Sequence, residues 1–284
     1  MLTATSEIRI GNAGMHTTLL FERSVRGTIV RRDKLAYDTR FAATVAGKPE
    51  KVGHIFLLVE GRYAPSAGEA IRGPLGLVLA DDEIERLTAK SRTFRTDGDQ
   101  IHVIHLRYMG DDILAPIGMA AGTLPLPAAF WDVARRAIHA PDQIGDVFDA
   151  LAANGITKPA ARIHDEPERY RRLWDALRPL YEAYGGTVSL KQLAASLDMS
   201  MRQVGRDAKD LAATFGFGGG FRDALLVLRL RVAVLLLSAP EATVAAVASA
   251  VGYGSPIAMA RAFRDAKLPA PSAVQAALKG EGLE

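Results

Sequence analysis

Three groups of residues in this chain have types and spacing that could support chemistry: a run of glycines, six histidines and a stripe of basic side chains. The glycines lie in the segment TFGFGGGF, residues 214–221. A phosphate-binding loop would require a following Lys-Ser/Thr pair, or G-x-G-x-x-G spacing between a strand and a helix. Arg222 and Asp223 follow instead, and Phe221 interrupts the spacing. We therefore interpret this segment as a connector that holds no ligand.

The histidines do not show the spacing of a metal site. His102 and His105 lie three residues apart, so on a strand they would point to opposite faces of a sheet. The other four are isolated in the sequence and are expected at the surface or in the core: His16, His54, His139 and His164. The chain also has no cysteine, which excludes disulfides and thiolate ligands. We predict no metal, no cofactor and no catalytic residue.

The basic stripe lies on a predicted amphipathic helix. Val204, Ala208 and Leu211 recur at helical spacing and are expected to face inward. A second face carries basic side chains and one amide: Arg202, Gln203, Arg206 and Lys209. Such side chains can bind phosphates and the edges of bases in the major groove of DNA. The alternative is a solvated charged face, which the nearby Asp207 and Asp210 favour.

A repeat of this unit makes DNA contact the preferred interpretation. Residues 189–209 and 243–264 align with an offset of 54 and then 55 residues, and one residue is inserted in the second turn. Each copy predicts a short helix, a tight turn and a second helix, the arrangement of a helix-turn-helix. An arginine recurs in register, as Arg206 and Arg261. The candidate DNA contacts of the second copy are Ser255, Arg261 and Arg264.

Helix-start signals support both copies. Ser189 with Gln192, and Ser200 with Gln203, are predicted capping boxes, in which each serine accepts a hydrogen bond from a backbone N–H group. The second copy has residues suited to the turn, the N-cap and the first helical position: Gly252, Ser255 and Pro256.

The elements that must position these helices divide the chain into two parts. The first part alternates with a period of two and is rich in β-branched residues, which is typical of a sandwich or small barrel. Its expected strands are residues 7–11, 17–22, 27–32, 41–47, 54–61, 75–80, 91–96 and 101–108. Apolar residues at helical spacing then predict two amphipathic helices, at 127–140 and 142–156.

The remaining boundaries follow from prolines, charges and helical periodicity. We predict a first domain over residues 1–155, with strands at about 1–110 and a helical hairpin at about 126–154. A linker follows at 156–168, and a helical domain at 169–284. Within the helical domain we expect two helix-turn-helix units, at about 189–211 and 243–266, joined by a long helix at about 221–238.

Composition and charge are consistent with this division. The 284 residues are 49% hydrophobic and 24% charged, which suits about two globular domains. The net charge is +3, but between Thr187 and Leu278 ten Lys or Arg residues stand against six Asp or Glu residues. A positive C-terminal third suits a polyanionic partner.

Two features concern localisation. The most apolar window, Ala224–Leu237, is shorter than the about 20 residues that cross a bilayer, and it contains Arg229 and Arg231. We expect a core helix whose two arginines are exposed or make contacts. The first residues lack the basic and apolar regions of a signal peptide. We therefore predict a cytoplasmic protein that does not enter a membrane.

Together these motifs resemble the DNA-binding domain of the AraC/XylS family of transcription regulators. The segment SLKQLAASLDMS resembles the first helix-turn-helix of that family, and LRLRVAVLLL resembles its linker-helix pattern Arg-x-x-x-Ala-x-x-Leu-Leu. VAAVASAVGYGS and ARAF resemble the second unit, and KLPAPSAV resembles the terminal Gly-x-x-Pro-Ser region. The likeness covers about residues 169–278.

The chain departs from the family pattern in both units. Ala208 and Met259 stand where the family usually carries phenylalanine, and Pro256, Ile257 and Ala258 stand where polar residues usually open the second recognition helix. These apolar side chains offer no hydrogen bonds to bases, although they can contact a thymine methyl group. We therefore expect the second unit to hold phosphates, chiefly through its arginines.

The resemblance implies a transcription regulator, with activation the expected mode. It implies an N-terminal cupin-like jelly roll that holds a small-molecule effector, and a helical hairpin that forms a homodimer. It also implies double-stranded DNA and RNA polymerase as partners. In all, the sequence predicts an α+β multidomain fold with a C-terminal all-α domain.

Two other functions stay open at this point. One is a regulator with weakened DNA binding that acts through a protein partner, which the apolar start of the second recognition helix favours. The other is a cupin-type enzyme with a helical accessory domain, which lacks the expected metal-ligand pattern.

Overall fold

The computed structural model describes most of the chain: residues 2–10, 13–21, 25–33, 36–37, 52–65, 71–80, 94–95, 100–109, 122–157, 168–214, 220–237, 239 and 241–279. It divides into two compact units. The first contains Met15–Lys34 and Pro49–His164, and the second contains Leu2–Gly14, Leu35–Lys48 and Asp165–Glu284. Strands dominate the first unit and helices the second, which confirms the predicted α+β multidomain class.

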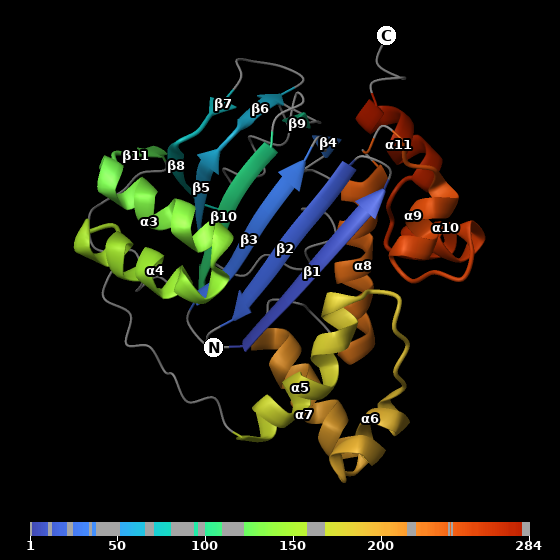
Figure 1. The fold of residues 1–284 in the computed structure, drawn as a ribbon. Coiled ribbons are helices and arrows are strands. Elements are labelled where there is room, and N and C mark those ends of the chain that lie inside the picture. The colour runs from blue at the N-terminus through green and yellow to red at the C-terminus, as the bar shows by residue number, and fades with distance from the viewer. Residues whose placement is uncertain are drawn as a thin grey trace. The chain divides into compact units, whose positions relative to one another are not determined.

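An antiparallel sheet forms the first unit (Figure 1). The strands of this sheet that belong to the first unit are, in spatial order, β2 (Ala13–Phe21), β3 (Val25–Asp33), β10 (Gln100–Met109), β5 (Val52–Glu60), β8 (Leu75–Ala80) and β11 (Gly122–Leu124). In the register, Ile104 of β10 lies opposite Ile29 of β3 and Leu57 of β5. Five of these strands match predicted ones, whereas β11 was not predicted.

The remaining strands are short. β6 (Arg62–Pro65) pairs with β7 (Ile71–Arg72) and with β9 (Phe94–Arg95), and β4 covers Ala36–Tyr37. Of these, only β9 was predicted, as part of residues 91–96. The strand predicted at 41–47 lies outside the described residues.

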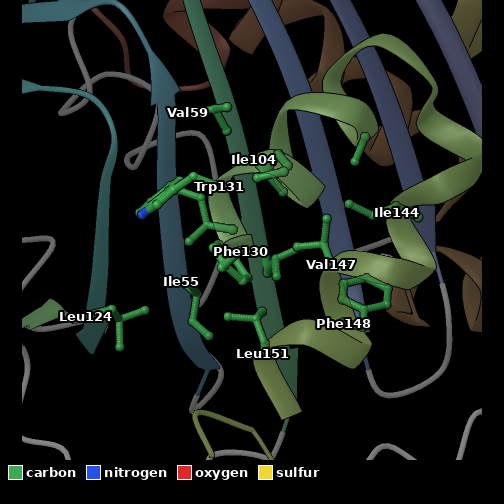
Figure 2. Close-up of a cluster of buried hydrophobic side chains, with 14 of the residues drawn as sticks. Ile55, Val59, Ile104, Leu124, Phe130, Trp131, Ile144, Val147, Phe148 and Leu151 are labelled. Atoms are coloured by element: carbon green, nitrogen blue, oxygen red, sulfur yellow. The ribbon is translucent and has the colours of Figure 1, made fainter. Parts of the chain in front are cut away.

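Two helices cover one face of the sheet. They are α3 (Ala128–His139) and α4 (Ile144–Ala153), joined by the 3-10 turn η1 (Pro141–Gln143). Figure 2 shows their apolar side chains directed at the strands, among them Phe130, Trp131, Val147, Phe148 and Leu151, which lie against Ile55 and Ile104. The two helices appear where their periodicity predicted them.

The burial of these side chains corrects one argument for a dimer. The resemblance implied that a homodimer forms through this hairpin. Phe130 and Phe148 are instead buried in the core of the first unit. The physical reason is the strand period of two, which gives the sheet an apolar face that needs a cover. The hairpin supplies that cover within one chain.

The second unit is mainly helical (Figure 1). Its helices are α5 (Glu168–Glu182), α6 (Leu190–Leu197), α7 (Met201–Thr214), α8 (Phe221–Leu237), α9 (Val244–Ala250), α10 (Pro256–Asp265) and α11 (Pro271–Lys279). The long apolar α8 packs against α7, α9, α10 and α11. In the described part of the chain, no helix combines the length and apolar character needed to cross a membrane.

The first strand of the chain belongs to this helical unit. β1 (Leu2–Ile10) packs against α5 and buries every second residue. The Trp174 indole nitrogen donates a hydrogen bond to the Thr3 carbonyl over 3.1 Å. The Ser6 and Tyr184 hydroxyl groups share a hydrogen bond of 2.8 Å. These bonds join β1 to residues about 170 positions later in the chain, which sequence periodicity cannot reveal.

Candidate nucleic-acid interface

The first helix pair begins with the predicted capping box. The Ser189 hydroxyl accepts from the Gln192 backbone nitrogen at 3.2 Å, and the Gln192 side chain accepts from the Ser189 backbone nitrogen at 2.9 Å. The box satisfies N–H groups that the first turn of α6 would otherwise leave unpaired. α6 ends at Leu197, and its C-cap residue Asp198 adopts the left-handed conformation with φ 53°. A short turn then leads into α7.

Helix α7 has a buried face and an exposed face, as its spacing predicted. Val204, Ala208 and Leu211 are buried. Arg202, Arg206 and Lys209 are exposed to solvent. The two faces follow directly from the helical repeat, since each set recurs at intervals of three or four residues. Basic side chains on a free helix face can reach nucleic-acid phosphates or base edges.

Asp207 does not belong to the exposed face. Its side chain is only 2% exposed and accepts hydrogen bonds from the Gln203 amide nitrogen at 3.2 and 3.1 Å. In the sequence, Asp207 favoured a solvated charged face over DNA contact, because it would place a carboxylate beside the basic stripe. The Asp207 carboxylate is instead turned inward, away from the basic side chains. Of the two acids that favoured a solvated face, only Asp210 is exposed.

Gln203 makes different contacts from those predicted. The Ser200 hydroxyl accepts from the Gln203 backbone nitrogen at 3.2 Å, so half of the second predicted capping box is present. The Gln203 side chain does not return to Ser200. It donates to Asp207 and accepts from Arg206, because a buried carboxylate requires a donor. Gln203 thus connects a buried acid to an exposed arginine.

The second helix pair carries the predicted turn and caps. Gly252 adopts φ 82°, and the Ser255 hydroxyl accepts from the Ala258 backbone nitrogen at 3.1 Å. Pro256 occupies the first turn of α10. Thr243 caps α9 in the same way, through the Ala246 nitrogen at 3.1 Å. Both helices of this pair therefore begin at side-chain caps.

Helix α10 also has two faces, but its first turn is apolar. Met259 and Phe263 are buried, whereas Arg261 and Arg264 are exposed. Ile257 is 75% exposed. Besides Met201 of α7, at 54%, it is the only large hydrophobic residue recorded as exposed among the residues whose burial is described. Both residues lie in the first turn of the second helix of a pair.

The structure therefore places the seven predicted contact residues on two equivalent helices of one compact unit. Arg202, Gln203, Arg206 and Lys209 lie on α7, while Arg261 and Arg264 lie on α10 and Ser255 caps it. Five of the seven are exposed. Gln203 and Ser255 are half-buried, and each makes an intramolecular hydrogen bond.

The histidines of the first unit are less isolated than expected. His54 Nδ1 and His105 Nε2 share a hydrogen bond of 3.0 Å, and the Phe56 ring stacks on His105 at 4.0 Å between centroids. His102 Nδ1 lies 3.1 Å from a Glu60 carboxylate oxygen. His54 is buried and hydrogen-bonded, as expected for a core histidine, although strand pairing supplies its partner from 51 positions away. Among the described residues, no cluster of three or more His, Cys, Asp or Glu side chains is arranged to hold a metal ion.

Arg229 was expected to be exposed or to make a contact, and it makes one: its side chain is half-buried, and Nη2 donates to the Gly186 carbonyl at 2.7 Å. Burial lowers the pKa of Arg229, and the nearby Tyr253 opposes that shift. An arginine in the middle of an apolar helix was the available signal, but its partner is 43 residues away.

Comparison with solved structures finds distant likenesses. ToxT from Vibrio cholerae is 11% identical, with a TM-score of 0.38 over 90% of this chain and 100% of ToxT. CuxR, an AraC-like transcriptional activator, is 13% identical, with a TM-score of 0.27 over 77% of this chain and 80% of CuxR. The chain is similar to an AraC-like regulator. A ToxT structure with a bound unsaturated fatty acid is similar at 12% identity and a TM-score of 0.34, over 93% of this chain and 99% of ToxT.

No protein-family model matches the chain, and no curated protein matches it in sequence.

Proposed function

We propose that this protein is a sequence-specific transcription regulator that binds double-stranded DNA through α7 and α10. One observation carries the proposal: each of these helices follows a short turn, buries one face and exposes arginines on another. Both helices also pack against the single long helix α8. Two such helices on one support can enter successive major grooves.

The charges and contacts suggest different tasks for the two helices. On α7, Arg202, Gln203 and Arg206 offer hydrogen bonds to base edges, and Lys209 offers a charge to a phosphate. On α10, Arg261 and Arg264 offer charge, but the first turn is apolar. We assign base discrimination mainly to α7 and phosphate binding mainly to α10.

We further propose that the first unit has a cupin-like jelly-roll arrangement and holds a small-molecule effector. The regulator would act as an activator in contact with RNA polymerase. These finer assignments rest on the resemblance of the sequence motifs. A homodimer stays part of the proposal, although the apolar face of the α3–α4 hairpin is already occupied by the sheet.

The test is selection of bound sequences from randomised duplex DNA, followed by gel shifts at several salt concentrations. We expect the selected site to bind at least about a thousandfold more tightly than random DNA. The logarithm of affinity should fall linearly with the logarithm of salt concentration, since bound phosphates release counterions. Arg202→Ala should reduce this preference. Arg136→Ala, which removes an exposed arginine of α3, is the matched control.

Two results would favour the alternatives. Weak binding without sequence preference would favour a regulator that acts through a protein partner, which the exposed Ile257 already supports as the second candidate. No binding to any duplex at low salt would overturn the proposal.

A further inference from the structure

Arg229 connects the long helix α8 to the segment between α5 and α6. Its Nη2 donates to the Gly186 carbonyl over 2.7 Å, and the side chain is half-buried. α5 packs against both α6 and α7. The segment that Arg229 binds is therefore attached directly to the first helix pair.

The same segment touches the turn of the second helix pair. A Cβ atom placed on Gly252 would lie 2.4 Å from the Tyr184 carbonyl oxygen and 2.6 Å from the Gly185 Cα atom. Gly252 also has φ 82°, a conformation that side chains disfavour. The two backbones therefore meet with no room for a side chain between them.

Tyr253, next to Gly252, lies near Arg229. Burial raises the pKa of Tyr253, and the positive charge of Arg229 opposes this shift. Within the described part of the chain, the buried Tyr253 hydroxyl and the Arg229 Nε atom have no hydrogen-bond partner. Leaving such buried groups unpaired is unfavourable in free energy. An apolar pair at this position would pack without leaving buried polar groups unpaired.

The segment itself is anchored from the other side. The Tyr184 side chain is 2% exposed, and its hydroxyl shares a hydrogen bond of 2.8 Å with Ser6 of β1. A fully packed tyrosine cannot easily shift. The carbonyl groups of Tyr184 and Gly186 thus provide a fixed support for both Gly252 and Arg229.

We propose that Arg229, Gly252 and the backbone of residues 184–186 form a joint that fixes α10 relative to α7. This joint sets the spacing between the two DNA half-sites that the protein accepts. The inference rests on the proposed DNA binding. Two recognition helices bind together only if their separation matches the groove repeat of about 10–10.5 base pairs. Arg229 is a positioning residue here, and it needs no contact with DNA.

The joint predicts a sharp dependence on spacing. Insertion or deletion of one base pair between the half-sites moves one groove relative to the other by about a tenth of a turn. The parent protein should lose about tenfold or more in affinity, because the second helix can no longer bind at the same time. Arg229→Met keeps the apolar stem and removes the donor. For this variant we expect the loss of affinity caused by a one-base-pair change in spacing to be about threefold or less. Its affinity for an isolated first half-site should be unchanged within about twofold.

Two further variants, Arg229→Lys and Arg222→Met, provide an intermediate case and a control. The lysine keeps the charge with a less suitable geometry, so its spacing penalty should lie between those of the parent and Arg229→Met. Arg222, exposed in the first turn of α8, is the matched control: its removal can weaken overall binding but should leave the spacing penalty at the parent value.

A distance measurement without DNA tests the joint directly. The chain has no cysteine, so Asp210→Cys on α7 and Asp265→Cys on α10 accept spin labels at two chosen, exposed positions. We expect a narrow distance distribution in the parent and in Arg222→Met, and a broader one in Arg229→Met. A folded Arg229→Met protein with the parent's distribution and spacing penalty would overturn the inference.

If Arg229→Met cannot be purified, Arg229→Lys decides the question by the same two readouts. Parent-like results for that variant would overturn the joint. Failure of the parent itself to bind any duplex would instead overturn the proposed function, while the distance measurement would still report on the joint.

Discussion

Arg206 illustrates how a single residue can be prepared for binding. Its guanidinium donates to Gln203, which in turn donates to the buried Asp207. Because Asp207 is enclosed, it holds this short chain of hydrogen bonds in one arrangement. An arginine that is already oriented loses less conformational entropy when it binds a base. The arrangement suits a paired hydrogen bond to guanine.

We therefore predict that Arg206→Ala weakens binding to the selected operator by about 1–3 kcal/mol, and binding to random DNA much less. The same direction is expected for Arg202→Ala. Gel shifts with both kinds of DNA measure the difference, and Arg136→Ala again serves as control. If both single variants bind the operator like the parent, α7 does not dock as proposed.

Arg261 is expected to behave differently, because it contributes charge without base reading. Arg261→Ala should weaken binding to all sequences about equally and lower the salt slope by roughly one unit, as expected for the loss of one phosphate contact. The slope of log affinity against log salt concentration is the measurement. A loss confined to the selected operator would show instead that Arg261 reads a base.

The hydrogen bond between Ser6 and Tyr184 is expected to stabilise the folded protein. Ser6→Ala leaves the hydroxyl of the buried Tyr184 without its partner, so the free energy of unfolding should fall by about 1–3 kcal/mol. Adding Tyr184→Phe should cost less than it does in the parent, since the two residues share one bond. Urea denaturation gives the free energy of unfolding of the parent, the two single variants and the double variant. Arg9→Ala, at an exposed β1 residue, should change little. Strictly additive losses would show that the hydrogen bond contributes nothing.

At the scale of elements, α7 and α10 are equivalent in position but differ in their first turns. α7 opens with Met201, Arg202 and Gln203, whereas α10 opens with Pro256 and Ile257. Since only the first set includes hydrogen-bonding side chains, we predict an asymmetric operator. One half-site should be sharply specified and the other tolerant, a helical turn away. Selection from randomised DNA reveals the two profiles, and two equally sharp half-sites would contradict the prediction.

The tolerant half-site offers a finer check. An exposed Ile257 can bury a thymine methyl group, which is worth about 0.8 kcal/mol, or a factor of about four in affinity. Replacing one thymine by uracil at the contacted position should lower the affinity of the parent by this factor. The same replacement should leave the affinity of Ile257→Ser unchanged. Equal responses of both proteins at every thymine would assign Ile257 no role in binding.

The packing of the α3–α4 hairpin determines what a charge at Phe148 should do. Phe148 lies in the core against the sheet, so a charge there must be buried or must open the hairpin. We predict that Phe148→Asp unfolds the first unit and does not yield a folded monomer. Circular dichroism and sedimentation velocity distinguish these outcomes. A folded variant with a raised monomer fraction would restore the idea of a dimer through these side chains. Asp149→Asn, on the exposed face of α4, is the matched control and should leave fold and mass unchanged.

At the scale of the whole molecule, the chain consists of two compact units, the first dominated by strands and the second by helices. The helical unit depends on α8, which packs against α7, α9, α10 and α11 and so supports both helix pairs. A rigid support fixes the separation of the two helices, so that both bind together only when the half-site spacing matches it. The proposed joint at Arg229 supplies part of this rigidity.

The sequence by itself determined the local features. The helix pairs, the caps at Ser189 and Ser255, the turn at Gly252 and the inward face of α7 were all predicted and are present. Most strand positions in the first unit were predicted as well. These features depend on residues no more than a few positions apart, where periodicity and capping chemistry act directly.

Tertiary structure decided where the polar and apolar groups of those elements are used. It turned Asp207 inward, paired His54 with His105, covered the sheet with the hairpin and placed β1 in the helical unit. The bond from Arg229 to Gly186 spans 43 residues, and that from Ser6 to Tyr184 spans 178. No local pattern specifies such partners, because burial of an element's apolar face depends on which other elements the fold brings against it.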